Sequence, residues 1–384
     1  MDDPHRWRAE YGNLAYDEAL ESWVVVGYRA AREVLVADGW SSDPANSETT
    51  RRVLAQLGMS ESPLARTMLA LDGVDHSRIR DAVRDVFTPR YIAQLTDGVR
   101  AIAASVIEPL PSGEPFEFMS EVAQPFPLAV IAEWLALDVD TTRILWDGAG
   151  DLVRMLDGFF ATEPDLTTAT NTFLAVVTEF LPLASDRRDR PGEDLFSVLA
   201  EDPRLDLDEV VVNAILLAVA GHETTANLLG SSMIRLLDGS GGERLVDRVD
   251  TSDPAVIDEL LRLDGPARLL ARVALRDQTI EGRTIAAGER VVVGIGAANR
   301  DPELFADPDE FRLDRTAAPP HLAFGFGRHR CLGAALARLE AGTALRQIMS
   351  RGPELAGPVR MRDTAVVVGP ETLPLTFTKV MSHE

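Results

Sequence analysis

The chain has 384 residues and a formal net charge of −23, which argues against a nucleic-acid-binding protein and against one that binds anionic membranes. Its 46% hydrophobic and 26% charged residues are typical of a globular protein, and its length predicts two lobes or one large domain. A single cysteine excludes an intrachain disulfide, the N-terminus lacks the apolar region of a secretion signal, and the apolar stretch 210–220 is too short to span a bilayer. We therefore expect a monomeric cytoplasmic protein.

Helical periodicity dominates the chain, and the strand-like runs are short. In the first half, the pattern predicts a strand at 23–26, a helix at 29–37, a loop with short helical pieces at 41–61, a helix at 75–87 and a charged loop at 186–193. In the second half, it predicts a helix at about 208–237, another from Pro254 to Gly265, short β-like runs over 273–289, and strands at 290–293 and 373–377. The sum is a mainly α protein with small sheets. We expect one domain with a β-rich part at about 1–60, a helical core at about 61–265 and a mixed region at about 266–384.

The predicted helix at 208–237 carries apolar residues on nearly every side, as a helix inside a large protein does. Asp206 and Glu209 form the pattern of a capping box at its start. Its middle reads Ala220-Gly221-His222-Glu223-Thr224-Thr225. A buried carboxylate there is costly unless it is paired, and a threonine can donate to the carbonyl four residues back and loosen the helix. Gly221 leaves room for a planar ligand. The alternative is a partly exposed patch of a long helix.

Cys331 is the only cysteine, and it lies in Phe324-Gly-Phe-Gly-Arg-His-Arg-Cys331-Leu-Gly333, directly before a helix-forming run. Glycines let the backbone approach the sulfur closely, and a helix N-terminus favours the ionised thiolate. A lone cysteine is otherwise a small buried hydrophobe. The glycines favour a single-thiolate metal site over that alternative.

Both motifs resemble those of the cytochrome P450 family, whose haem loop reads Phe-Gly-x-Gly-x-(His/Arg)-x-Cys-x-Gly and whose oxygen-activation motif reads (Ala/Gly)-Gly-x-(Asp/Glu)-Thr. The resemblance implies the cytochrome P450 fold, a large helical lobe with a long central helix plus small β-sheets. It implies a haem b whose iron is bound by the Cys331 thiolate, a ligand that favours O–O cleavage. It assigns Thr224 to hydrogen bonding with O₂ and Glu223 to relaying protons from solvent.

The resemblance also implies a set of residues around the haem. Arginine and histidine bind carboxylates well, although each such base judged singly is an ordinary surface residue. The bases that would bind the haem propionates are His76, Arg80, Arg272 and His329. The other residues that would contact the haem are Ala220, Gly221, Ala323, Phe324, Gly325, Gly333 and Ala337.

Glu259 and Arg262 share a helix face and match the ExxR pair of the family, which is structural. Taken alone, such a pair usually marks a solvated ion pair. The family's third partner is an arginine in a Pro-x-Arg-Phe segment, but this chain has Glu310 at that position. The third partner is therefore open, and Arg315 is the candidate substitute.

The implied activity is a monooxygenase that inserts one oxygen atom of O₂ into a C–H or C=C of a medium-sized apolar metabolite, in natural-product biosynthesis or catabolism. The sequence shows no flavin or nicotinamide fingerprint, so we expect electrons from a separate ferredoxin and ferredoxin reductase. A basic patch for an acidic ferredoxin is predicted from Arg78, Arg84, Arg328, Arg330 and Arg338. The alternatives are a coupling or ring-closing relative, a peroxide-using relative, and a haem-thiolate sensor.

The substrate pocket is harder to predict. By analogy with the family, its lining would come from 47–71, 156–180, 216–220, 267–271 and 371–373, which are mostly aliphatic apart from Phe159 and Phe160. Arg268 either anchors a substrate carboxylate or faces solvent, and we favour solvent.

Overall fold

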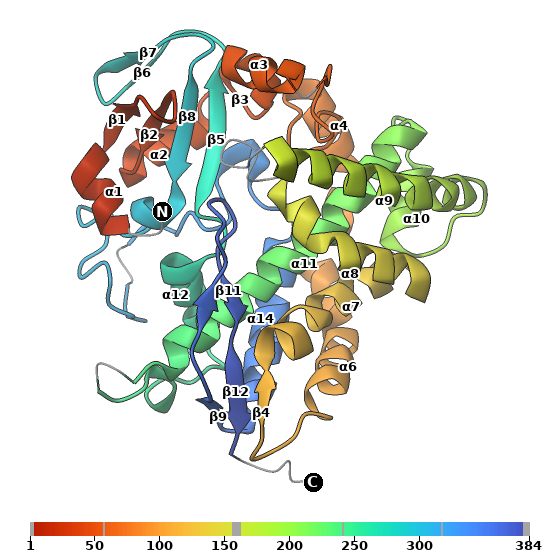
Figure 1. Ribbon diagram of the computed structural model, residues 1–384, viewed down its shortest axis with the longest axis vertical. Helices are drawn as coiled ribbons and strands as arrows, with labels where there is room; N and C mark the ends of the chain where they lie inside the picture. The colour runs from red at the N-terminus through yellow and green to blue at the C-terminus, as the bar shows by residue number, and fades with distance from the viewer. Residues whose placement is uncertain (1–3, 57, 156–162, 240–241, 316–317, 379–384) are drawn as a thin grey trace.

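The computed structural model describes residues 4–56, 58–155, 163–239, 242–315 and 318–378, so that Phe159 and Phe160 lie outside the described residues. The described residues are mainly helical and include four small sheets (Figure 1). The α-helices are α1 Pro4–Tyr11, α2 Tyr28–Val36, α3 Glu48–Gln56, α4 Gly73–Val83, α5 Pro89–Ile92, α6 Thr96–Ile107, α7 Pro125–Trp134, α8 Val139–Arg154, α9 Glu163–Asp189, α10 Leu195–Glu201, α11 Leu207–Leu237, α12 Pro254–Asp264, α13 Ile295–Ala298 and α14 Ala334–Ser350.

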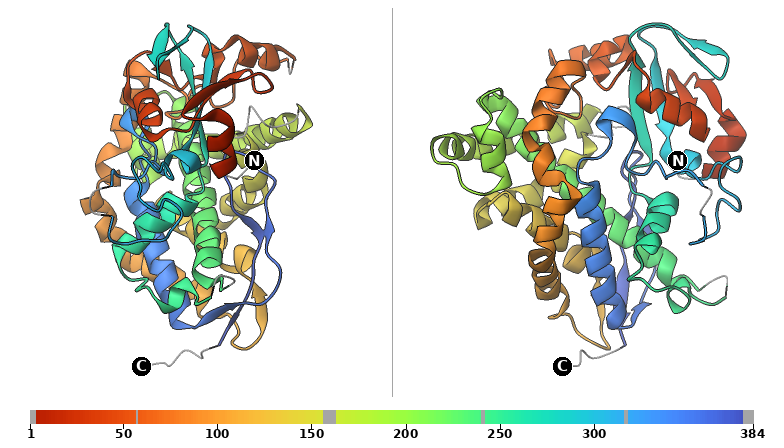
Figure 2. Two further views of the ribbon diagram at one scale, coloured as in Figure 1. Left: turned by 90° about the vertical axis from the view of Figure 1, so that its left-hand side faces the viewer. Right: turned by 180° about the vertical axis from the view of Figure 1, so that it is seen from behind.

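Helix α11 crosses the middle of the molecule (Figure 1). It packs against α7, α8 and α9 and also against α14, which lies beside α6 in the view from behind (Figure 2, right). Its start is the predicted capping box, since the Glu209 N–H donates to Asp206 Oδ1 over 2.8 Å and the Asp206 N–H donates to Glu209 Oε2 over 3.1 Å. Most of its side chains are buried, which confirms the prediction of a buried central helix.

The five-stranded sheet joins segments from distant parts of the chain, in the order β1-β2-β8-β5-β3 (Figure 1, upper left). Val24 of β2 pairs in parallel with Val292 of β8, and Arg272 of β5 pairs antiparallel with Val291. A second sheet, β4-β12-β9, lies at the opposite end of the molecule near the C-terminus (Figure 1). The strands are β1 Leu14–Asp17, β2 Ser22–Val25, β3 Trp40–Ser41, β4 Pro115–Glu117, β5 Leu269–Ala274, β6 Gln278–Ile280, β7 Arg283–Ile285, β8 Arg290–Gly294, β9 Pro353–Leu355, β10 Arg360–Met361, β11 Pro370–Thr372 and β12 Pro374–Phe377.

Most predicted elements are present, and three differ in extent. The predicted loop at 41–61 holds the nine-residue helix α3, and the predicted helix at 75–87 is α4 followed by a 3₁₀ turn. The predicted charged loop at 186–193 was wrong in its first half, because α9 continues to Asp189. Tertiary contacts hold this last turn: Arg188 donates to the Ala200 carbonyl over 3.0 Å and to the Leu205 carbonyl over 2.9 Å.

No helix among the described ranges is long and apolar enough to cross a lipid bilayer.

Candidate active site

Cys331 lies in a tight loop between a 3₁₀ turn at Gly327–His329 and the first residue of α14. Its N–H donates to the Phe324 carbonyl over 2.8 Å, and Gly325 adopts a left-handed φ of 64° within that turn. Gly327 also has a positive φ of 74°, and a Cβ there would lie 2.5 Å from the Leu35 carbonyl of α2. Only glycine meets both demands, so the glycines of the motif fix the loop against α2.

The Cys331 side chain is exposed, yet protein atoms surround its thiol closely enough that burial raises the pKa. Both observations hold if the thiol lies at the base of a hollow. A hydrogen bond from the Gly333 N–H and the positive charges of Arg80 and Arg330 act in the opposite direction and favour the thiolate. A metal ion bound to the sulfur would remove the remaining proton.

The rings of two of the predicted propionate-binding bases lie in contact, tilted by 41° to one another. The rings of His76 on α4 and His329 in the cysteine loop lie 4.1 Å apart between centroids. His76 is buried, and its Nε2 has no hydrogen-bond partner among the described residues. Burial, aided by the charges of His329 and Arg80, lowers its pKa to about 4. Asp72, which the sequence did not reveal, lies with Oδ1 3.3 Å from His329 Nε2.

The two predicted arginines approach the same region from different elements. Arg80 of α4 donates to the Arg330 carbonyl over 2.6 Å, which ties α4 to the cysteine loop. Arg272 of β5 is buried, and burial lowers its pKa to about 10. Its guanidinium donates to the Ala271 carbonyl over 2.7 Å and forms no ion pair within the described part of the chain. A buried guanidinium with so few acceptors favours an anionic ligand beside it.

These groups fit a metal cofactor that carries carboxylates, as haem does. The thiol supplies one ligand, and the free nitrogen of His76 and the guanidinium of Arg272 supply donors for carboxylates. The described residues contain no group of three or more His, Cys, Asp or Glu side chains that could hold a bare metal ion. On α11, a Cβ at Gly221 would meet only Ile131, at 3.8 Å, which leaves that face open.

The remaining predicted haem contacts lie on the same elements. Gly325 and Ala323 are buried in the cysteine loop, whereas Gly333 and Ala337 at the start of α14 are half-buried. Phe324 is also half-buried, and its ring lies 4.6 Å from the guanidinium of Arg338. Their contact with a cofactor stays a prediction.

The motif in the middle of α11 is held by buried polar contacts. Thr224 Oγ1 donates to the Ala220 carbonyl over 2.7 Å, the contact predicted from the sequence. Glu223 is buried, and its Oε2 accepts from Arg362 Nη1 over 2.8 Å. The Asn227 amide donates to the Glu223 carbonyl over 2.8 Å. Sequence reasoning required a partner for Glu223 but missed Arg362, which directly follows β10 and belongs to no motif.

The ExxR pair is a buried ionic cluster. Arg262 donates to Glu259 through Nε and Nη2, each over 2.8 Å, and Arg315 Nε donates to Glu259 Oε1 over 2.8 Å. Arg315 is thus the third partner. Glu310 contributes its backbone carbonyl, which accepts from Arg262 over 3.1 Å and from Arg315 over 2.8 Å. Burial acts to raise the pKa of Glu259, but the hydrogen bonds from Arg262 and Arg315 outweigh it and the pKa falls below its usual range.

A family model for cytochrome P450 matches residues 254–351, which include the ExxR helix and the cysteine loop. The chain is 31% identical over 93% of its length to the polyketide biosynthesis cytochrome P450 PksS of Bacillus subtilis, of which it covers 89%. It is 33% identical over 81% of its length to the steroid C26-monooxygenase of Mycolicibacterium smegmatis, of which it covers 79%. The chain belongs to the cytochrome P450 family. Its fold matches the crystal structure of P450BioI in complex with an acyl carrier protein that bears hexadec-9Z-enoic acid, with a TM-score of 0.87, 30% identity and 97% of each chain covered.

Membership in the cytochrome P450 family identifies the chain as a monooxygenase with a haem whose iron has a cysteine thiolate ligand. Cys331 is the only cysteine available for that role. The roles of Glu223 and Thr224 with O₂ and protons, and of the bases with haem propionates, stay predictions from the motifs.

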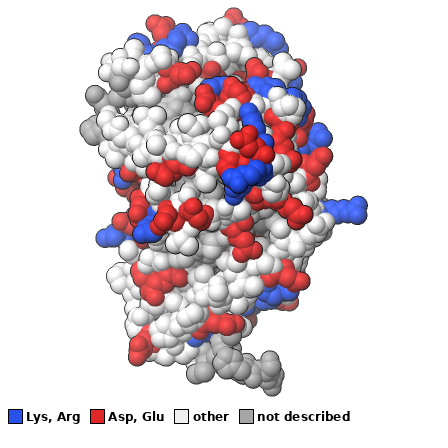
Figure 3. Space-filling view, turned by 90° about the vertical axis from the view of Figure 1, so that its right-hand side faces the viewer, with Lys and Arg blue, Asp and Glu red and all other residues white. Residues whose placement is uncertain are grey.

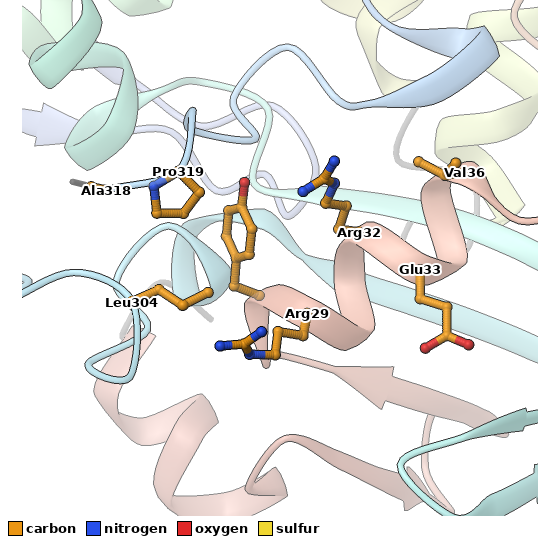
Figure 4. Close-up of a pocket in the computed structure, with 8 residues that line it drawn as sticks. Arg29, Arg32, Glu33, Val36, Leu304, Ala318 and Pro319 are labelled. Carbon is orange, nitrogen blue, oxygen red and sulfur yellow. The ribbon is translucent and has the colours of Figure 1, made fainter. Parts of the chain in front are cut away.

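A surface hollow of about 630 Å³ lies elsewhere, beside α2 (Figure 4). Tyr28, Arg29, Arg32 and Leu304 are among its lining residues, and none of the lining residues belongs to the predicted haem or substrate-pocket sets. Arg268, which we expected to face solvent, is only partly exposed, and its Nη1 donates to the Leu263 carbonyl over 3.1 Å. It is not among the residues that line that hollow.

We predict that Arg315→Ala lowers the free energy of unfolding by about 2–3 kcal/mol, because it removes one partner of a buried carboxylate that keeps another. Denaturant unfolding of the holoprotein measures this. Since the pKa of Glu259 is lowered, the loss should be complete at neutral pH and should shrink as the pH falls through the folded-state pKa of Glu259.

Arg312→Ala is the matched control. The Arg312 side chain is partly exposed and pairs with Asp307 and Asp314, whereas its backbone N–H, which the substitution keeps, donates to Glu259. Arg312→Ala should therefore lower the free energy of unfolding by less than Arg315→Ala does, because exposed ion pairs contribute little. Equal losses in the two variants would contradict the role of Arg315 as the third partner.

Proposed function

We propose that this cytochrome P450 takes electrons from a separate ferredoxin and its reductase and oxidises a C–H or C=C bond of a medium-sized apolar metabolite. The observation that carries the proposal is the buried Glu223, fixed beside Thr224 by Arg362 and Asn227. A reaction that uses O₂ and two electrons must also deliver protons, and this pair is suited to that work. A peroxide-driven reaction or simple ligand sensing has no need of it.

Haem bound through Cys331 supplies the reductive activation of O₂. The protein's part is to hold protons and to position them. Glu223 Oε2 accepts from Arg362, whereas no described residue donates to Oε1, which is therefore the atom that can take a proton. The side chain of Arg362 is 16% exposed, so that the ion pair extends from the buried helix toward the surface.

Thr224 has a single hydroxyl proton, and it is donated to the Ala220 carbonyl. In this state Oγ1 offers only lone pairs, and it can accept a hydrogen bond from a protonated neighbour. To donate toward the open face of Gly221, the hydroxyl must turn away from Ala220. We therefore propose that Thr224 alternates between these two hydrogen bonds as it passes a proton onward.

The names of the relatives support the proposed size and character of the substrate. Their names connect them with a polyketide pathway and with a steroid, and P450BioI was crystallised with a fatty acyl chain on its carrier protein. All of these molecules are largely apolar. We propose a substrate of the same class for this chain.

Of the five arginines that the sequence suggested for a ferredoxin-binding patch, four have carboxylate partners in the structure. Arg78 pairs with Glu209 and Arg84 with Asp81 and Asp85. Two others also have carboxylate partners, Asp38 for Arg328 and Asp258 for Arg338.

Arg330 is exposed, adjoins Cys331, and forms no ion pair with any described residue. Figure 3 shows acidic and basic side chains interspersed over one face of the molecule as well. We propose Arg330 as the main contact for an acidic ferredoxin.

Thr224→Ala should uncouple the enzyme. Loss of the hydroxyl should slow the proton-dependent step by about 10²-fold or more, so that hydrogen peroxide replaces product for most of the NAD(P)H consumed. The assay uses a purified bacterial ferredoxin and reductase, with a compound that shifts the Soret band from low to high spin as substrate. Thr224→Ser keeps a hydroxyl and should stay largely coupled. Parental coupling in Thr224→Ala would rule out the proposed role.

Arg330→Glu should raise the apparent KM for the same ferredoxin about 3–10-fold, the effect of losing an exposed charge contact of about 1 kcal/mol. Substrate affinity should not change, as the Soret shift reports. Arg84→Glu is the control, because two aspartates already neutralise Arg84 and its KM effect should be smaller. An unchanged KM in Arg330→Glu would contradict the proposal that ferredoxin contacts Arg330.

A further inference from the structure

Asp72 is a carboxylate that none of the sequence motifs explains. It occupies the N-cap position of α4, where an aspartate usually accepts a hydrogen bond from the first turn of its own helix. The Asp72 side chain makes no such bond. Its carboxylate instead accepts hydrogen bonds from segments that are distant in the sequence, which indicates a role outside α4.

The Asp72 carboxylate connects three elements. Both of its oxygens accept from the Ser42 N–H, each over 3.1 Å, and Oδ2 also accepts from the Ser41 hydroxyl at the end of β3. Oδ1 lies 3.3 Å from Nε2 of His329 in the cysteine loop. An ionised carboxylate only accepts, so the proton of this contact is on Nε2. Burial acts to raise the pKa of Asp72, but these hydrogen bonds outweigh it and hold the pKa below its usual range.

The elements that Asp72 connects carry or adjoin the bases that were predicted to bind haem propionates. Two of these bases lie on α4, and His329 lies in the cysteine loop. The fourth, Arg272, lies on β5, which pairs with β3 at Ser41. Asp72 therefore holds together the segments from which all four bases come.

His76 of α4 is the base with an unused ring nitrogen. The residue is 2% exposed, and its Nε2 has no hydrogen-bond partner among the described residues. A buried polar atom without a partner costs free energy unless a ligand supplies one. The ring of His329 lies against the ring of His76, with 4.1 Å between the centroids. Because Asp72 holds His329 at Nε2, it also limits how the His76 ring can turn.

We propose that Asp72 is a positioning residue for haem binding: it fixes the His329 ring, which packs against His76 and directs the free Nε2 of His76 at a haem carboxylate. In this arrangement the two histidines, which the motifs treat alike, have different parts. His76 is the donor to the carboxylate, and His329 is the support that Asp72 holds in place.

The first readout is the resonance Raman spectrum of the ferric holoprotein, in which the bending bands of the haem propionates respond to their hydrogen bonds. Asp72→Ser keeps a residue that caps helices well, but its side chain is too short to reach His329. It should shift the propionate band in the same direction as His76→Phe, because both weaken the same donor. Asp75→Ala is the control and should leave the band in place, since it removes an exposed carboxylate of the same helix that pairs with Arg78. A parental band in a folded Asp72→Ser holoprotein would overturn the proposal.

Asp72→Asn retains an acceptor oxygen with the same reach and should keep the parental band. A band shifted as in His76→Phe would overturn the proposal, because the charge of Asp72 and not its hydrogen bond to His329 would then be the cause. The asparagine side chain has nearly the size of the parental one, so this variant tests the proposal even if Asp72→Ser does not fold.

The second readout is the rate of haem transfer from the ferric holoprotein to apomyoglobin. Asp72→Ser should raise this rate about 10-fold, the effect of weakening one hydrogen bond to an anion. In the His76→Phe background Asp72→Ser should add little, because its effect passes through His76. Equal effects of Asp72→Ser in the two backgrounds would overturn the proposal. Neither readout needs ferredoxin or turnover, so a failure of the proposed function would leave both unchanged.

Discussion

The ion pair between Glu223 and Arg362 is the interaction on which the motif at 220–225, in the middle of α11, depends. A carboxylate in the interior of a central apolar helix costs several kcal/mol unless a cation reaches it. That cation is Arg362, which lies in the hairpin of β10 and β11. Glycines in the hairpin and in α11 allow the two elements to lie close together. A Cβ at Gly369 would lie 2.2 Å from Asn227 Oδ1, and one at Gly230 would lie 2.5 Å from Pro370 Cγ. The hairpin can therefore lie directly on α11 at the motif.

A second buried ionic cluster, formed by Glu259, Arg262 and Arg315, stabilises the part of the fold next to the cysteine loop. Arg262 donates to Glu259 and also to the carbonyls of Asn299 and Pro308, over 2.9 and 2.7 Å. Asn299 in turn accepts from the Leu322 N–H over 2.6 Å, just before the cysteine loop. The cluster thus fixes backbone rather than binding a ligand. Two buried charge networks, Glu223 with Arg362 and Glu259 with Arg262 and Arg315, thus stabilise the α11 motif and the segment that leads into the cysteine loop.

The sequence was sufficient wherever the signal was local. The capping box at Asp206 and Glu209 and the Thr224 contact with Ala220 each depend on residues within a few positions of one another. Arg315 could be named as the candidate substitute as well, because the departure at Glu310 pointed to a nearby arginine, although Arg312 is also close in the sequence. The structure shows why the departure is tolerated: position 310 is needed for its carbonyl.

Partners from distant segments could not be predicted. Arg362 and Asp72 carry no motif, and only the folded chain brings them to Glu223 and His329. For the same reason, the sequence could not reveal the partner of Arg78, which we had predicted to belong to a basic patch. In the fold its guanidinium binds Glu209, over 2.7 and 2.8 Å, and so holds α4 against the start of α11. The extension of α9 to Asp189 also depends on contacts with later residues, which no local pattern reveals.

The central claim is that the thiolate of Cys331 holds the haem iron, and the absorption spectrum of the reduced carbon monoxide complex tests it most directly. The parent should show the red-shifted Soret band that a thiolate ligand produces. Cys331→Ser should remain folded, since the Cys331 backbone N–H still donates to Phe324, but should lack that band. A folded Cys331→Ser variant that kept the red-shifted band would contradict the claim.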